Sequence, residues 1–275
     1  MKSIAYLIAA SAALMPIQAS LAQDAPSKPA PKAPDETNEA FDRNMHFAKL
    51  DMLKAEANYG EIGRLIELAD KPEEAVAHLD WLGMQFQTGA SSYFSFQYSQ
   101  LLISFASTLP DSQGKQIRGT ALAAIMHAII ASQAEAQQCA DRTARSDRPM
   151  RFLQTLRSSG LMELDDFTRS QSGWIALKME QRTWAIRRQI DDTSFLCANG
   201  MRAFAAGLAN GKSKEVETPE GQLGRTLAVK PPEEMSFERV ANETWWPKAE
   251  EIRARNEATL KTLLNVDVLA PTAGN

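Results

Sequence analysis

The sequence predicts an all-α protein, an irregular bundle of about eight helices with one disulfide and an extended segment near the C-terminus. Three observations lead to this fold class. Apolar residues recur at three- and four-residue intervals through residues 39–211, the chain has two cysteines, and it becomes polar and turn-rich after Gly211. We therefore expect a helical core domain over residues 39–211. An extended segment and a C-terminal helix, residues 212–275, should pack on that core.

The first 22 residues have the layout of a secretory signal peptide. Lys2 precedes an apolar run over residues 4–14, and small residues stand at Ser20 and Ala22, just before the expected cleavage point. The run is too short to span a bilayer comfortably. We predict a cleavable signal over residues 1–22, export to a bacterial periplasm and no transmembrane segment after cleavage. The alternative is an uncleaved N-terminal anchor.

Residues 23–38 contain four prolines within a polar sequence. Proline-rich chains are stiff and solvated, so this stretch is typical of a spacer between the cleavage point and the folded domain. The alternative interpretation is a proline-rich ligand for a protein partner.

Three helical patterns open the core domain. The first begins near Glu39 and repeats apolar residues on one face, namely Phe41, Met45, Ala48 and Met52. A short helix follows and ends at Leu68. Asp70 as the N-cap and Pro72 in the first turn then predict the start of the third helix. Its apolar side consists of Val76, Leu79, Leu82 and Phe86.

The segment between Trp81 and Pro110 contains no charged residue, and it is serine-rich and aromatic. Its polar residues make it a poor membrane span. We predict a helix buried on most sides at the centre of the domain. The alternative is an apolar groove for a partner or a lipid.

A long helix is predicted over residues 113–138. One of its faces carries small residues suited to close helix packing, together with one isoleucine: Ile117, Ala121, Ala124, Ala128 and Ser132. Cys139 falls at the C-terminal end of this helix.

Cys139 and Cys197 are the two cysteines of the chain. In an oxidising compartment a pair of cysteines indicates a disulfide. Closing this loop would restrict the unfolded chain by roughly 4 kcal/mol. The spacing fits neither a redox C-x-x-C motif nor a zinc site. Free or intermolecular thiols are the alternative.

Four arginines spaced by threes follow Cys139: Arg142, Arg145, Arg148 and Arg151. Pro149 prevents one continuous helix, so we predict a turn with Asp147 as an N-cap and a helix that ends at Ser159-Gly160. Guanidinium groups bind carboxylate or phosphate, and this makes Arg142 and Arg145 candidate binding residues. Local pairing with Asp141 and Asp147 is the alternative.

Two more helices are predicted over residues 172–192 and 194–211. In the first, Arg187 and Asp191 lie four residues apart and could form an intrahelical ion pair. Its apolar face consists of Ile175, Met179, Ile186 and Ile190. In the second, the apolar positions are Cys197, Met201, Phe204 and Leu208, so Cys197 should face inward. A disulfide would bring the arginine turn near Arg187 and Asp191, which we take as candidate binding residues. A buried salt-bridge network around the disulfide would have the same pattern.

The segment between Cys139 and Met201 resembles a family of uncharacterised exported bacterial proteins. The matching stretches are C-A-D-R-T-A and F-L-C-A-N-G-M, similar to the family's C-x-D-x-[ST]-A and D-x-x-x-L-C-x-G-G motifs. The sequence departs from the pattern at Asn199-Gly200, where the family has paired glycines. The family has no assigned activity, so the resemblance implies secretion and a disulfide but no reaction.

After Gly211 the chain is expected to be extended over the surface, with a strand or two in residues 212–234. A short helix and a final one should follow, with Pro247 in the first turn of the last. We expect Trp245 and Trp246 to anchor this helix to the body; the alternative is an aromatic patch that faces a partner.

Catalytic patterns are sparse, and we assign no catalytic, metal-binding or cofactor-binding residue. His46, His78 and His127 fall on three different predicted helices. They could meet at a zinc ion, but single histidines on helices more often lie at the edge of a core. A serine hydrolase site stays open because the residues of a triad are dispersed in sequence.

The formal net charge is −4. An acidic, exported chain does not suggest nucleic-acid binding. We expect a non-enzymatic periplasmic protein that binds an envelope component or a protein partner. Its candidate surfaces are the arginine-rich turn and the uncharged aromatic helix. The alternative is a hydrolase or metalloenzyme whose site assembles from distant residues.

Overall fold

The computed structural model describes residues 41–69, 71–187, 194–211, 213–216, 226–229 and 237–264. The predictions for the signal peptide and the linker, residues 1–38, lie outside the described residues, as do those for Ile190 and Asp191. The predicted N-cap Asp70 is wrong, because the helix that begins at Pro72 has Lys71 as its N-cap. The all-α fold class is confirmed, because the described residues form helices and one two-stranded sheet.

The helices in chain order are α2 (Arg43–Ala55), α3 (Tyr59–Glu67), α4 (Pro72–Thr88), α5 (Ser92–Ala106), α6 (Asp111–Glu135), α7 (Asp147–Ser158), α8 (Asp166–Arg187), α9 (Ser194–Cys197), α10 (Met201–Ala209) and α11 (Asn242–Leu264). Short 3-10 helices are η2 (Ala136–Gln138), η3 (Arg142–Ser146) and η4 (Leu161–Glu163). Strands β1 (Ser213–Val216) and β2 (Thr226–Val229) pair antiparallel, with Ser213 opposite Val229.

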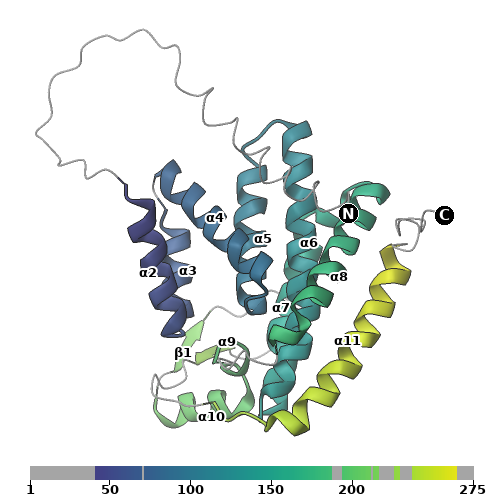
Figure 1. Cartoon of the computed structure of the whole chain (residues 1–275). Helices are drawn as coiled ribbons and strands as arrows, with labels where there is room; N and C mark the ends of the chain where they lie inside the picture. Colours follow the sequence, from purple (N-terminus) through teal and green to yellow (C-terminus); the bar gives the residue numbers. More distant parts are fainter. Residues whose placement is uncertain are drawn as a thin grey trace, which may run out of the picture. The chain divides into compact units, whose positions relative to one another are not determined.

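Helix α6 is the centre of the bundle and packs against α5, α7, α8 and α11 (Figure 1). Its predicted small-residue face is buried except for the half-buried Ile117. Small residues let α8 approach closely. A Cβ atom at Gly119 would lie 3.1 Å from Thr168 Cγ2, and Ser172 Oγ donates to the carbonyl of Gly119 at 2.8 Å.

Helix α5 lies in the interior, as its lack of charge predicts. It packs between α4 and α6, and its buried residues are Ser92, Tyr93, Phe94, Ser95, Ser99, Leu102 and Ala106. The ring of Phe94 meets Trp81 of α4 edge to face, with 5.4 Å between the ring centroids. Within the described part of the chain, no helix is both long and apolar enough to cross a membrane.

The predicted disulfide between Cys139 and Cys197 is present, with the two Cα atoms 5.4 Å apart and both residues buried. It joins the end of η2 to α9. The segment before α11 also pairs here, because Ala140 N–H donates to the carbonyl of Glu238 and Val240 N–H donates to that of Gln138. Three stretches that are distant in the sequence are thus held together at one point.

The predicted turn and helix after the disulfide are also present. Helix α7 ends at Ser158, and Gly160 has a φ of 69°, a left-handed conformation that glycine adopts without strain. Asp147 is the first helical residue rather than the N-cap, a position that Ser146 occupies.

Helix α2 buries a face other than the one predicted. Met45 and Met52 are 69% and 53% exposed, whereas Leu50 and Leu53 are buried. The reason is that α2 packs against α3 and α4, whose buried side chains form one cluster with Leu50 and Leu53. Its sequence contains two apolar stripes, and the neighbouring helices select between them.

The predicted helix over residues 194–211 is divided in two, because the chain breaks between α9 and α10. Cys197 faces inward as expected, but Met201, Phe204 and Leu208 are exposed. At the break, Gly200 packs so closely on Asp141 that a Cβ atom would overlap the carboxylate. The apolar stripe of this segment therefore does not continue into the core.

The C-terminal helix is anchored by its tryptophans, as predicted. Trp245 is fully buried, and Trp246 stacks on Trp184 of α8 with 4.4 Å between ring centroids. Pro247 lies inside α11 rather than in its first turn, because the helix already begins at Asn242. In the described residues 237–241 there is no separate short helix.

We expect the variant with both Cys139→Ser and Cys197→Ser to lose about 2–4 kcal/mol of unfolding free energy. The disulfide joins positions 58 residues apart, and without it the unfolded chain has more conformational entropy. Urea denaturation of the variant and of the wild type, each with and without reductant, measures this. Reductant should destabilise the wild type and leave the variant unchanged. Equal stability of the two proteins would show that the disulfide contributes nothing.

Candidate functional site

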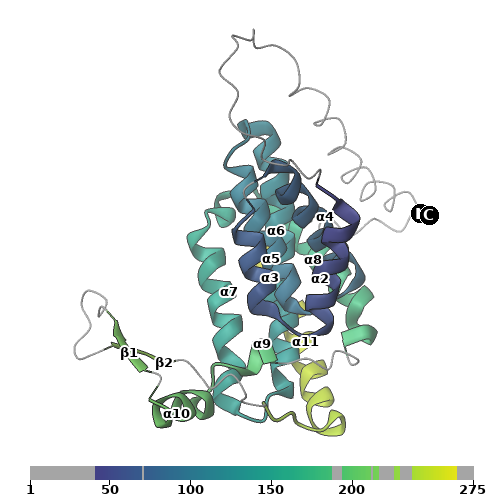
Figure 2. The same ribbon diagram turned by 90° about the vertical axis from the view of Figure 1, so that its left-hand side faces the viewer.

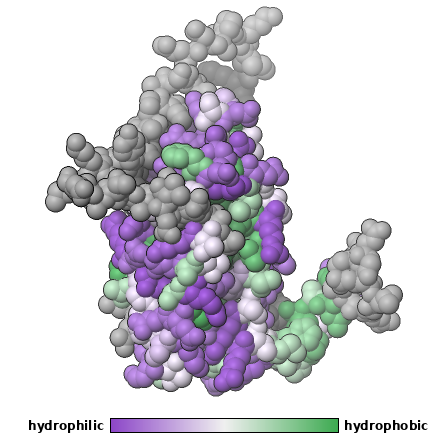
Figure 3. All heavy atoms as spheres, turned by 90° about the vertical axis from the view of Figure 1, so that its right-hand side faces the viewer, coloured by the Kyte–Doolittle hydropathy of each residue, from purple (hydrophilic) through white to green (hydrophobic). Residues whose placement is uncertain are grey.

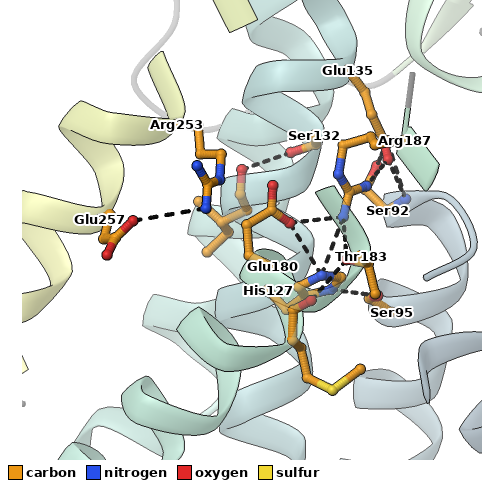
Figure 4. A network of polar contacts seen from close by, with 12 residues as sticks. Ser92, Ser95, His127, Ser132, Glu135, Glu180, Thr183, Arg187, Arg253 and Glu257 are labelled. Carbon is orange, nitrogen blue, oxygen red and sulfur yellow. Dashed lines mark hydrogen bonds and ion pairs between the residues drawn. The ribbon is translucent and has the colours of Figure 1, made fainter. Parts of the chain in front are cut away.

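A buried polar cluster centres on Arg187 at the end of α8 (Figure 4). The side chain is 0% exposed and pairs with Glu135 of α6 and Glu180 of α8. Its Nη2 lies 2.7 Å from Glu180 Oε2 and also donates to Thr183 Oγ1 at 3.3 Å. An unpaired buried charge is strongly destabilising, so each of these three ionised groups depends on the others.

Glu135 also holds the start of α5. Its carboxylate accepts hydrogen bonds from the backbone N–H of Ser92, at 3.1 and 3.2 Å, and from Ser92 Oγ at 2.6 Å. Ser91, the residue before the helix, supplies no side-chain cap. A negative charge is favourable at this end of a helix. One carboxylate therefore connects α5, α6 and α8.

Glu180 and Arg187 are ionised at neutral pH. Burial by itself would raise the pKa of Glu180, but Arg187 and His127 outweigh it and hold that pKa at about 2. Burial would lower the pKa of Arg187, and the adjacent Glu180 and Glu135 raise it instead. The predicted partner of Arg187 was Asp191, which lies outside the described residues. The observed partners lie 7 and 52 positions away in the sequence.

Ser95, His127 and Glu180 form a row within this cluster. Ser95 Oγ lies 2.9 Å from His127 Nδ1, and His127 Nε2 lies 3.3 Å from Glu180 Oε2. A serine, a histidine and an acid in this order are the groups of a hydrolase triad. Ser95 and His127 are both 0% exposed, however. In this arrangement a substrate has no access to Ser95, and the row belongs to the structural cluster.

The structure separates the arginines that the sequence grouped as candidate binding residues. Arg187 is enclosed, so it does not share a binding surface with Arg142. Arg145 donates from Nε and Nη2 to the carbonyl of Cys139, at 3.0 and 2.8 Å, and stabilises the chain next to the disulfide. Arg142 is exposed and forms no ion pair with another described residue.

An open cleft with a volume of about 510 Å³ lies beside the disulfide. It is bordered by the start of α3, by α5, by the start of α7 and by α9. The lining residues that matter for recognition are Asn58, Tyr59, Tyr93, Gln97, Arg148 and Phe195. The cleft brings together the two surfaces that the sequence singled out, since Tyr93 and Gln97 belong to the uncharged aromatic helix and Arg148 to the arginine-rich turn.

Arg148 is held in this cleft by Phe195. Its Nε donates to the carbonyl of Phe195 at 3.1 Å, and its guanidinium carbon lies 4.4 Å from the centroid of the Phe195 ring. Burial and the nearby Arg151 lower the pKa of Arg148. The side chain is 25% exposed, and neither of its Nη atoms is hydrogen-bonded to a described residue. The four N–H groups of the two Nη atoms can thus bind an anionic group, while Nε also lies 4.0 Å from Asp147 Oδ2.

Aromatic side chains line the cleft beside Arg148. The Tyr93 hydroxyl donates to the carbonyl of Tyr59 at 2.8 Å, and the rings of Tyr93 and Phe195 meet edge to face at 4.8 Å. Burial raises the pKa of Tyr93, so its hydroxyl stays protonated. These side chains can therefore contact an apolar or aromatic group while Arg148 binds its charge.

Arg148 is the site residue that the selection of Arg142, Arg145, Arg187 and Asp191 missed. Two sequence signals point towards the cleft. Arg148 is one of the four arginines spaced by threes, and Tyr93 and Gln97 are four residues apart, so they lie on the same face of a helix. Neither signal shows which arginine meets which face, because Phe195 lies 47 positions away in the sequence.

His46 and His78 meet across α2 and α4, with 2.7 Å between their Nε2 atoms. One ring must therefore donate a proton to the other, and both cannot be cationic. Burial and the adjacent His46 lower the pKa of His78 from 6.5 to about 4. His127 lies apart, in the Arg187 cluster. Among the described residues, no group of three or more histidine, cysteine or acidic side chains is arranged to hold a metal ion.

No protein-family model matches the chain, and no significant similarity to a curated protein or to a solved structure is found.

Substituting Arg187→Met should lower the unfolding free energy by about 3–5 kcal/mol, because two carboxylates are left buried without their counter-charge. The matched control is Arg43→Met, which removes an ion pair with Asp80 whose partners are 54% and 41% exposed. Exposed pairs contribute at most about 1 kcal/mol. Urea denaturation of both variants measures the difference, and equal losses would contradict a structural role for the cluster.

Stability should fall as the pH drops from about 6.5 towards 4. The pKa of His78 is lower in the folded chain than in the unfolded chain, so the unfolded chain binds more protons in this interval. A His78→Gln variant lacks this group, and its stability should fall less between pH 7 and pH 4.5. Urea denaturation at both pH values compares the two proteins. The same pH-dependent loss in the variant would show that His78 does not carry the effect.

Proposed function

We propose that the chain is an exported, non-enzymatic binding protein of the bacterial envelope. It holds an anionic group of an envelope component or of a protein partner in the cleft at Arg148. The observation that carries this proposal is the cleft itself. It combines aromatic side chains with a guanidinium that Phe195 fixes through Nε and whose two Nη atoms are not hydrogen-bonded to a described residue. Ligand sites commonly combine apolar walls with a few fixed polar groups.

Two features support the compartment. The buried disulfide is of a kind that persists in oxidising compartments such as the periplasm. The first 22 residues have the layout of a signal peptide. The resemblance of residues 139–201 to exported bacterial proteins agrees with both and stays a prediction.

A hydrolase is the second candidate, and the row Ser95–His127–Glu180 is the observation in its favour. Hydrolysis would require Ser95 to become accessible, and it is 0% exposed. A fluorophosphonate probe should therefore leave the wild-type protein unlabelled. Labelling that is lost in the Ser95→Ala variant would replace the binding proposal by the hydrolase.

Substituting Arg148→Gln should remove the ligand from the protein. A charge-assisted hydrogen bond contributes about 1.5–3 kcal/mol, so the affinity should fall at least about tenfold. Native mass spectrometry of protein purified from its own envelope measures the bound mass. We expect the wild type and the control Arg142→Gln to carry the same adduct and Arg148→Gln to lose it.

Arg148→Lys separates binding from stability, because lysine keeps the charge and loses the paired N–H groups. It should retain part of the adduct. A thermal unfolding curve for each variant shows whether the fold is intact. A bare wild-type protein, or an adduct that Arg148→Gln retains, would contradict the proposal.

A further inference from the structure

The cleft at Arg148 contains charges of both signs. Arg148 lies at the start of α7 and Glu67 is the last residue of α3, and both line the cleft. Figure 2 shows α3 and α7 beside each other, with α9 below them. A site for an anion alone has no use for Glu67, because its carboxylate repels negative charge. The acid therefore points to a second charged group on the ligand.

The position of Glu67 follows from the contact between α3 and Tyr93. A Cβ atom at Gly63 would lie 3.2 Å from the Tyr93 hydroxyl, so this face of α3 rests on the tyrosine. Glu67 lies four residues further, on the same helix face. Burial is the main cause that raises the pKa of Tyr93; the charge of Glu67 raises it further, and that of Arg148 lowers it. Both charges thus act on one hydroxyl group.

No described residue neutralises Glu67. Its side chain is exposed and forms no hydrogen bond or ion pair with another described residue. Arg64, a second cation of the cleft, is held by Glu61 through hydrogen bonds from Nε at 2.7 Å and from Nη2 at 2.5 Å. The guanidinium of Arg64 is therefore engaged by its own partner. Glu67 and Arg148 are left as an acid and a base that ligand groups can pair with.

Exposed charges elsewhere are neutralised within a helix. Figure 3 shows the opposite face of the molecule, where α11 lies, and this face is mostly hydrophilic. On α11, Glu257 pairs with Lys261, with 3.0 Å between the carboxylate and ammonium atoms. A pair of this kind leaves little charge for a ligand. In the cleft, by contrast, the opposite charges come from different helices and stand beside aromatic side chains.

We propose that the cleft binds a small zwitterion, an amino acid or short peptide with an apolar or aromatic side chain. This inference rests on the proposed function, because Arg148 again binds the anionic group. The guanidinium donates from its Nη atoms to the ligand carboxylate, and Glu67 accepts from the ligand ammonium group. Tyr93 and Phe195 contact the ligand side chain. The volume of about 510 Å³ falls in the range of small-molecule sites, roughly 300–1,000 Å³.

Isothermal titration calorimetry with the dipeptide Ala-Phe and two blocked forms tests the inference. The N-acetyl form lacks the ammonium group, and the C-terminal amide lacks the carboxylate. We expect the wild type to bind Ala-Phe about tenfold more tightly than either blocked form, because each loses one charge-assisted hydrogen bond. Glu67→Gln should weaken binding of Ala-Phe about tenfold and leave binding of the N-acetyl form unchanged. Arg148→Gln should weaken Ala-Phe and leave the amide unchanged.

The matched control is Glu73→Gln, which removes an exposed acid of α4 outside the cleft. It should bind all three compounds as the wild type does, and thermal unfolding curves show whether each variant keeps its fold. Equal binding of Ala-Phe and its N-acetyl form, lost in Arg148→Gln, would overturn the zwitterion and leave the anion site standing. No binding of Ala-Phe would also overturn the inference, while the adduct on the purified protein still tests the proposed function. Unchanged binding of Ala-Phe to Arg148→Gln would contradict both.

Discussion

The buried guanidinium of Arg187 sets the arrangement of the central helices. It pairs with two carboxylates, and these come from different helices, Glu135 on α6 and Glu180 on α8. Glu135 in turn accepts hydrogen bonds from the start of α5. A shift of any of these helices would leave a charge or a helix end unsatisfied in the interior, at a cost of several kcal/mol. These contacts thereby fix the positions of α5, α6 and α8 relative to one another.

Cys139 follows four residues after Glu135, so the ionic cluster and the disulfide fix successive parts of the same helix end. The residues around the cysteines then build a helix cap. Asp141 and Thr143 accept hydrogen bonds from the first residues of α10, and Gly200 leaves room for the carboxylate of Asp141. The stretches around Cys139 and Cys197 thus form a structural joint between two segments.

The Arg148 cleft and the start of α10 both depend on this joint. Phe195, two residues before Cys197, holds the guanidinium of Arg148, and α10 begins four residues after Cys197. The disulfide therefore fixes the segment that positions both Arg148 and α10. The sequence identified the arginine-rich turn and the aromatic helix as candidates but selected Arg142 and Arg145. Their spacing is the same as that of Arg148, and only the position of Phe195 distinguishes them.

By itself the sequence determined the features that depend on neighbouring residues and on composition. These are the helical class, the end of α7 at Gly160, the burial of the uncharged α5 and the pairing of the two cysteines. The tertiary structure alone decided which stripe of α2 is buried, that α10 exposes its large residues, that His46 meets His78 and that Arg187 pairs with Glu135. The physical reason is that periodicity shows a helix has an apolar or charged face. Which neighbour covers that face is decided by contacts between residues far apart in the chain.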